Sequence, residues 1–236
     1  MGYLLCGPVG TGKTFLVECL AGEAAVPVVR LKNFRDRWVG STEGNLEQVF
    51  RLLRALGRCV VFVDEADQAL GRRAADPADS GLGGRVYAML AEEMGDPANR
   101  GRVVWCLASS RPDLIEVDLK RPGRIDVKVP LFPAATPREG LRLVVELCRR
   151  RGLAIESEHE AALLPLAPPL MTAGAAEGVA VKAYRLVRTG QGPAADALRR
   201  CLTGYRPPVP EEVLRFQIAL AAAEATDPEF VPPEFR

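Results

Sequence analysis

Residues Gly7–Thr14 read GPVGTGKT and form the most specific chemical signature in the sequence. Glycines at fixed positions let a backbone wrap so that several N–H groups point at one anion. Lys13 adds a cation for the β and γ phosphates of a nucleotide, and the Thr14 hydroxyl can bind Mg²⁺. A short apolar run precedes the loop and helical spacing follows it, which is the context this motif requires. The pattern predicts a triphosphate site made of Gly7, Pro8, Val9, Gly10, Thr11, Gly12, Lys13 and Thr14.

A second group of chemically useful residues follows the apolar run Val60–Val63, which ends in Asp64 and Glu65. Ligands collect at the carboxyl ends of strands in a parallel sheet. We therefore expect Asp64 to hold the hydration shell of Mg²⁺ and Glu65 to orient and deprotonate an attacking water. The alternative is a solvent-exposed acidic turn that caps the next helix.

The residues Asp64–Asp67 also spell DEAD, the signature of a large helicase class. Such helicases need two α/β lobes, and this chain has room for one lobe and a helical part. Their motif also lies much further from the phosphate loop. We therefore reject the helicase interpretation of these four letters.

The elements that must position these residues alternate between strands and helices as far as Pro133, and only helices follow. Strands that are apolar on both faces and alternate with helices indicate a parallel sheet covered on both sides. The predicted fold is α/β in residues 1–133, all-helical in 134–225 and an extended tail in 226–236. The expected strands are Tyr3–Cys6, Pro27–Leu31, Val60–Val63, Val103–Ala108 and Val127–Val129. The expected helices cover Phe15–Ala25, residues 42–56, Val86–Met94, Pro137–Arg151, Glu158–Leu166, Thr172–Arg188 and Pro210–Ala225, and Gly71–Gly84 is expected to be a loop.

The composition excludes several classes of protein. The 236 residues include 48% apolar and 26% charged residues, which excludes wholesale disorder. Lys and Arg number 31 against 30 Asp and Glu, so the net charge of +1 excludes a general nucleic-acid-coating protein. No apolar stretch approaches the ~18 residues of a membrane helix, and no signal peptide is apparent.

The six cysteines include no C-x-x-C pair, and the sequence has one histidine, so a zinc site is improbable. Cys6, Cys59 and Cys106 lie in or beside apolar runs, which suits buried thiols in a reducing compartment. We expect a cytoplasmic protein.

Taken together, the motifs resemble those of the AAA+ ATPases, specifically the AAA clade. Trp38-Val39-Gly40 resembles the aromatic–hydrophobic–Gly pore loop, and Ser109–Asp113 resembles the segment with the sensor-1 polar residue, which falls on Ser110. Leu119–Asp126 resembles the arginine-finger box, with Arg121 and Arg124 on its two arginine positions. The resemblance covers about Tyr3 to Val129 and is weaker in the helical remainder.

The resemblance implies a P-loop NTPase sheet of order 5-1-4-3-2, a helical lid, ATP and Mg²⁺ as bound groups, and a homo-oligomeric ring, usually a hexamer. Arg121 and Arg124 would reach the γ-phosphate of a neighbouring subunit. The alternative is that both arginines pair with local acids such as Asp118 and Asp126. Trp38 on a moving loop would grip an extended polypeptide, although a tryptophan can also simply pack in a core. Gly71–Gly84 is either a second pore loop or a solvated linker.

The sequence departs from the family pattern at several positions. Ser110 stands where the family usually has Asn, so we expect slower hydrolysis. Met1 lies two residues before the first predicted strand, whereas most family members carry a further segment there, so we expect a fragment of a longer protein or a truncated gene model. The family's lid histidine is absent, because His159 lies too far along, and the lid motif Gly-Ala-Asp is poorly matched by Ala173-Gly174-Ala175.

Three functions follow from these observations. The leading one is an ATP-hydrolysing motor that remodels or unfolds protein substrates. The first alternative, motivated by Ser110 and the missing segment, is an ATP-binding scaffold with little turnover. The second is a nucleic-acid motor of the same superfamily, against which the near-neutral charge argues.

Overall fold

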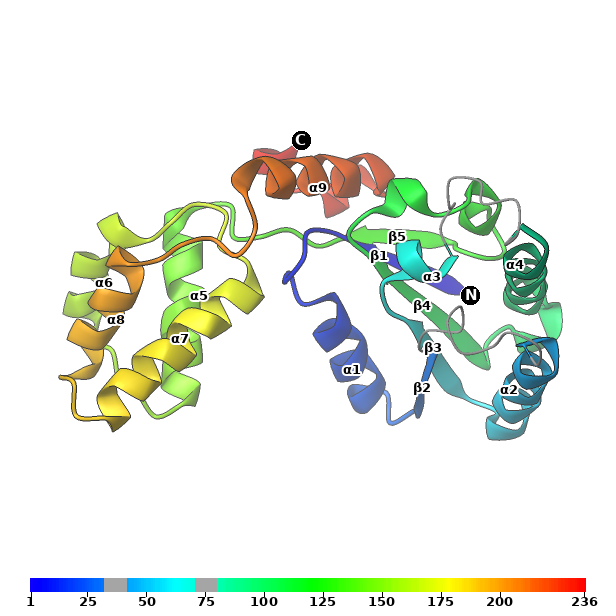
Figure 1. Ribbon diagram of the computed structural model, residues 1–236, viewed down its shortest axis with the longest axis horizontal. Helices are drawn as coiled ribbons and strands as arrows, with labels where there is room; N and C mark the ends of the chain where they lie inside the picture. The colour runs from blue at the N-terminus through cyan, green and yellow to red at the C-terminus, as the bar shows by residue number, and fades with distance from the viewer. Residues whose placement is uncertain (32–41, 71–79) are drawn as a thin grey trace. The chain divides into compact units, whose positions relative to one another are not determined.

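The computed structural model describes residues 1–31, 42–70 and 80–236 (Figure 1). The predicted pore-loop residues Trp38, Val39 and Gly40 lie outside these ranges, as do residues 71–79 of the predicted second loop. The chain forms two compact units. Unit 1 comprises Met1–Gly7, Lys13–Pro130 and Leu220–Val231, and unit 2 comprises Pro8–Gly12, Leu131–Ala219 and Pro232–Arg236. The domain limits expected at residues 133 and 225 remain predictions.

Unit 1 is built on a five-stranded sheet of order β2-β3-β4-β1-β5. This is the predicted order 5-1-4-3-2 read from the opposite edge, and every neighbouring pair is parallel. All five residues of β3 are buried, which explains the uninterrupted apolar run that marked this strand in the sequence. The strands are β1 (Gly2–Cys6), β2 (Val28–Leu31), β3 (Cys59–Val63), β4 (Val103–Ser109) and β5 (Val127–Pro130).

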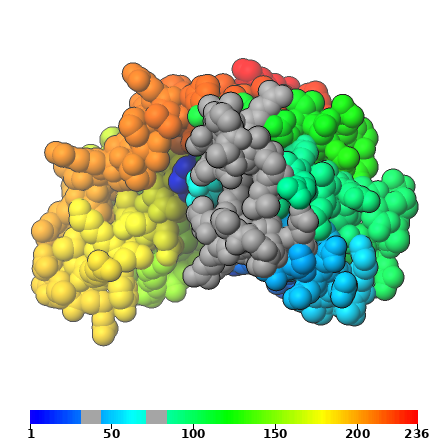
Figure 2. All heavy atoms as spheres, turned by 45° about the vertical axis from the view of Figure 1, so that its right-hand side comes forward, coloured from blue at the N-terminus to red at the C-terminus, as the bar shows by residue number. Residues whose placement is uncertain are grey.

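Helices cover both faces of this sheet, with α1 on one side and α2 and α4 on the other (Figure 1). The surface of unit 1 shows α2 and α4 side by side (Figure 2). Leu46, Phe50 and Leu53 form the buried stripe of α2, at the i, i+4, i+7 spacing of one helix face. The helices are α1 (Lys13–Glu23), α2 (Thr42–Leu56), α3 (Ala66–Leu70) and α4 (Ser80–Gly95).

The structure corrects one boundary, because α4 begins at Ser80 although a loop was predicted as far as Gly84. Glycine lowers helix stability by only about 1 kcal/mol per residue, so a helix that packs against α2 can continue through Gly84. Among the described residues, no helix is both long and apolar enough to cross a bilayer.

Unit 2 contains a cluster of four helices, of which α8 was not predicted. Thr136 and Glu139 form a reciprocal capping box that starts α5. Small residues on α7, including Ala176, Ala180 and Ala183, are fully buried, which lets α5 and α8 pack closely against it. The helices are α5 (Pro137–Arg150), α6 (Ser157–Leu163), α7 (Ala173–Arg188) and α8 (Ala194–Thr203).

The last helix, α9 (Glu211–Glu224), contributes residues to both units. In unit 1, Glu224 forms ion pairs with Lys120 and Lys128, and the Thr226 N–H donates to the Lys128 carbonyl at 3.2 Å. The tail predicted to be extended contains two short 3₁₀ turns, Pro228–Phe230 and Pro233–Phe235.

Candidate functional site

The phosphate loop has the curled backbone that its glycines predicted. Gly10 has φ +83° and Gly12 has φ +91°, a region that residues with a side chain rarely adopt. Thr11 closes the turn, because its N–H and its hydroxyl both donate to the Pro8 carbonyl, at 3.4 and 2.9 Å. A loop of this shape followed directly by the N-terminus of α1 is suited to bind an anion.

The middle of the loop belongs to unit 2, where it meets the first turn of α7. The Gly174 N–H donates to the Gly10 carbonyl at 2.8 Å. A Cβ at Gly174 would lie 3.3 Å from the Gly10 Cα, so the glycine at position 174 favours this close approach. The segment Ala173–Ala175, which matched the lid motif poorly, therefore lies against the loop, and Thr172 caps its helix by accepting from the Ala175 N–H at 3.2 Å.

Lys13, Thr14 and Asp64 come together at the carboxyl ends of β1 and β3. The Thr14 hydroxyl donates to Asp64 Oδ2 at 2.8 Å, although the two residues lie 50 positions apart in the sequence. The Lys13 ammonium donates to the Gly7 carbonyl at 2.7 Å. Burial lowers the Lys13 pKa to about 8, against the opposing effect of the Asp64 carboxylate. A partly desolvated cation that directly follows a glycine-rich loop in the chain is suited to a phosphate.

Glu65, the expected base, is exposed and has φ +48°, an uncommon conformation for a residue with a side chain. Its N–H donates to Asp64 Oδ1 at 3.0 Å, and its carbonyl accepts from the Gln68 N–H at 2.8 Å. These bonds hold the strained backbone and turn the chain sharply from β3 into α3. Strain of this kind is concentrated at functional sites, which supports a chemical role for this strand end.

Two further polar residues, Asp67 and Ser109, lie at the same edge and were not predicted as site residues from the sequence. Ser109 is the last residue of β4 and is 1% exposed, and its hydroxyl donates to Asp67 Oδ1. The Ser109 hydroxyl also accepts from the Arg111 N–H at 2.9 Å, which fixes the turn that carries Ser110. The signal was available, because Asp67 lies three residues after Asp64 and Ser109 ends the strand next to β3.

Arg121 and Arg124 make local contacts in this single chain. Arg121 forms an ion pair of 2.8 Å with Asp118, and the two side chains are 70% and 55% exposed. The Arg124 guanidinium donates to the Asp118 carbonyl at 2.8 Å. Asp126 pairs with backbone instead, since its carboxylate accepts from the Gly123 and Gly2 N–H groups at 2.8 and 3.1 Å, and these bonds lower its pKa.

The arginines lie on the side of the sheet formed by the amino ends of the strands. The phosphate loop follows the carboxyl end of β1. The Asp126 N–H donates to the Gly2 carbonyl at 2.8 Å, which places this segment at the amino end of β1, whereas Gly7 follows its carboxyl end. The two ends of a five-residue strand are separated by roughly 13 Å. The structure thus brings Lys13, Thr14, Asp64 and Glu65 together and leaves both arginines apart from them.

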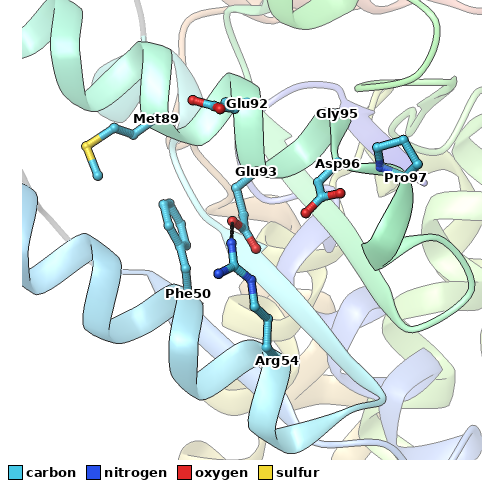
Figure 3. A pocket seen from close by; sticks show the side chains of 8 residues that line it. All are labelled: Phe50, Arg54, Met89, Glu92, Glu93, Gly95, Asp96 and Pro97. Atoms are coloured by element: carbon cyan, nitrogen blue, oxygen red, sulfur yellow. Dashed lines mark hydrogen bonds and ion pairs between the residues drawn. The ribbon is translucent and has the colours of Figure 1, made fainter.

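A hollow of about 480 Å³ between α2 and α4 is distinct from this site (Figure 3). Glu93, which is 5% exposed, forms an ion pair of 2.5 Å with Arg54 and accepts from the Asn99 amide at 2.9 Å. Phe50 and Met89 supply its apolar wall. Because its buried carboxylate already has two partners, we assign this cluster to packing between α2 and α4.

Comparison with known proteins agrees with the geometry. A sequence model described as "ATPase family associated with various cellular activities (AAA)" matches residues 3–132. The ATP-dependent zinc metalloprotease FtsH 1 of Salinibacter ruber is 36% identical over 133 residues, which are 54% of this chain and 19% of that protein. The cell division cycle protein 48 homolog of Archaeoglobus fulgidus is 36% identical over 134 residues, 56% of this chain and 18% of that protein.

The similarity also reaches into the helical part. The peroxisomal ATPase PEX6 of Penicillium chrysogenum is 32% identical over 173 residues, which are 70% of this chain and 12% of that protein. In these three cases the matched region spans about a fifth or less of the relative's length. The similarity therefore concerns one domain of larger proteins.

Proposed function

Because the chain belongs to the AAA family of ATPases, we propose that it binds ATP with Mg²⁺, hydrolyses it, and uses the cycle to remodel or unfold protein substrates as a ring of identical subunits, most simply a hexamer. The observation that carries the proposal is the meeting of Lys13, Thr14 and Asp64, the first two directly after the curled loop Gly7–Gly12 in the chain. A cation, a hydroxyl and a carboxylate at a strand end are the groups that a magnesium–triphosphate complex needs.

The donor set suits Mg²⁺. Thr14 Oγ1 and Asp64 Oδ2 are oxygen ligands 2.8 Å apart, and Mg²⁺ binds oxygen ligands. Among the described residues, no group of three or more His, Cys, Asp or Glu side chains is placed to hold a metal on its own. This fits an ion that takes most of its ligands from phosphate and water, with Thr14 and Asp64 as the protein's contribution.

Each residue has a specific role in this proposal. Bound ATP supplies the γ-phosphoryl group that is transferred to water. Lys13 exchanges the Gly7 carbonyl for phosphate oxygens, and the loop N–H groups neutralise further negative charge. Glu65, exposed and at a fixed turn, orients a water and accepts its proton, while Ser110 contacts the water or the γ-phosphate from the end of β4.

The placement of the arginines supports the proposed ring. Arg121 and Arg124 lie at the far edge of the sheet from their own phosphate loop, so they act on a nucleotide held by a neighbouring subunit. A relative named as a peroxisomal ATPase supports the hydrolysis of ATP. Trp38, Val39 and Gly40 remain the proposed grip on a polypeptide. All six cysteines are free, which supports a reducing compartment such as the cytoplasm.

The test is steady-state hydrolysis of ATP by wild type and Glu65→Gln, with ADP–Mg²⁺ affinity measured by calorimetry. We expect turnover to fall about 10²-fold or more, since general-base catalysis contributes about 10²–10⁴-fold, and affinity to stay within twofold. Glu23→Gln, the same change at an exposed position of α1, is the matched control.

Other outcomes select the alternatives. Equal turnover of wild type and Glu65→Gln would refute the assignment of Glu65. Tight ATP binding with no phosphate release from an assembled wild-type sample would favour a scaffold, and stimulation by DNA but not by unfolded protein would favour a nucleic-acid motor.

A further inference from the structure

The buried face of α9 contains one polar residue. Leu214, Gln217, Ile218 and Ala221 follow the i, i+3, i+4, i+7 spacing, and each is at most 8% exposed. Three of these four side chains are apolar. Burying the amide of Gln217 is unfavourable unless it forms a hydrogen bond, so its partner is informative.

That partner belongs to the phosphate loop. The Val9 N–H donates to Gln217 Oε1 at 3.3 Å, across 208 positions of the sequence. The next residue is held as well, because the Gly10 carbonyl accepts from the Gly174 N–H at 2.8 Å. Two consecutive residues of the loop are therefore fixed from outside by α9 and α7, both through residues of unit 2.

The surroundings of the contact are mixed in polarity. A cavity of about 90 Å³ beside Val9 is lined mainly by apolar side chains, with Thr172, Tyr205 and Glu211 as its polar members. Gln217 is 7% exposed, whereas Val9 is 54% exposed. Without the Gln217 carbonyl, the Val9 N–H would therefore depend on solvent for a partner and would lose the contact that fixes its position.

We propose that Gln217 is a positioning residue for the phosphate loop: it holds the Val9 N–H so that the amides from Gly10 onward stay arranged for the phosphates. The proposal rests on the proposed nucleotide site. Gln217 acts through the loop, so its loss should weaken binding and raise KM while leaving kcat nearly unchanged. A substitution that removes the hydrogen-bond acceptor of Gln217 but keeps the length of its side chain separates the lost hydrogen bond from a loss of packing.

The experiment is a double-mutant cycle between Gln217→Met and Val9→Pro, read as ADP–Mg²⁺ affinity by calorimetry. Methionine keeps the length of glutamine without the acceptor, and proline removes the N–H. We expect Gln217→Met to raise the Kd about 5- to 30-fold in the wild-type background and less than twofold in the Val9→Pro background, because the interaction is then already absent. Arg215→Ala, on the exposed face of α9, is the control and should leave the Kd unchanged.

A second readout needs no nucleotide. Hydrogen exchange at the Val9 amide of the free protein should be at least tenfold faster in Gln217→Met than in wild type. If Gln217→Met does not fold, Gln217→Asn replaces it, because it keeps the amide but shortens its reach by one methylene.

The outcomes separate the two proposals. An equal loss of affinity in both backgrounds, or an unchanged exchange rate at Val9, would refute positioning by Gln217. A wild-type protein that binds no nucleotide, but whose Val9 amide is deprotected by Gln217→Met, would refute the proposed function and leave the contact established.

Discussion

Unit 1 has two charged regions, which differ in how far their side chains are buried and bonded within the single chain. At the carboxyl edge of the sheet, Lys13 is partly desolvated and Thr14 is bonded to Asp64. At the amino edge, Arg121 is 70% exposed and forms an ion pair with its neighbour Asp118. Exposed ion pairs contribute little to stability, so Arg121 can leave Asp118 for a partner that binds it more strongly. Under the proposed function, the carboxyl edge binds the nucleotide of its own subunit and the arginines act on that of a neighbour.

The largest effect is expected from Arg121→Ala. Arginine fingers contribute about 10³–10⁵-fold to turnover, so ATP hydrolysis by an assembled sample should fall by at least about 10³-fold. Affinity for ADP–Mg²⁺ should stay within twofold, because Arg121 lies at the other edge from its own loop. Phosphate release and calorimetry measure the two quantities, with Arg51→Ala as an exposed control. A large loss of affinity would contradict the separation of the two edges.

We expect the Kd for ADP–Mg²⁺ to depend on pH, with a change of about tenfold. The Lys13 pKa in the free protein is about 8, and phosphate contact favours the charged form. Raising the pH from 7 to 9 deprotonates Lys13 in the free protein, so the Kd for ADP–Mg²⁺ should rise about tenfold. Calorimetry across this range measures the effect.

The matched control for this prediction is Lys13→Met, which has no proton to lose. It should bind more weakly than wild type at every pH and show a flat profile from pH 7 to 9. A flat wild-type profile would mean that Lys13 is not desolvated as the structure indicates.

The smallest effect is expected from Asp118→Ala, which frees Arg121 from its exposed partner. The protein concentration that gives half-maximal ATPase activity should fall about two- to fivefold, since an exposed pair competes only weakly with a neighbour's phosphates. Titration of the protein at saturating ATP measures this concentration. In an Arg121→Ala background, Asp118→Ala should leave the concentration unchanged. Lower activity of Asp118→Ala would instead show that Asp118 aligns the arginine.

Local patterns were sufficient to predict much of the fold. The phosphate loop was identified because its glycines, Lys13 and Thr14 act within eight consecutive residues. The strand before Asp64 was identified because a strand buried on both faces must be apolar throughout. Helix α8 was not predicted; glycines and prolines stand on both sides of its ten residues. The start of α4 was missed because packing overrode the low helix propensity of glycine.

The sequence by itself determined the parallel sheet, its order through the family resemblance, and the residues expected to bind phosphate and Mg²⁺, because each depends on short-range spacing. Only the tertiary structure joined Thr14 to Asp64, Ser109 to Asp67, and Val9 to Gln217. It also placed Arg121 at the edge of the sheet away from its own loop. Hydrogen bonds across 42 to 208 positions leave no periodic trace in a sequence, because the fold alone decides which distant polar groups meet.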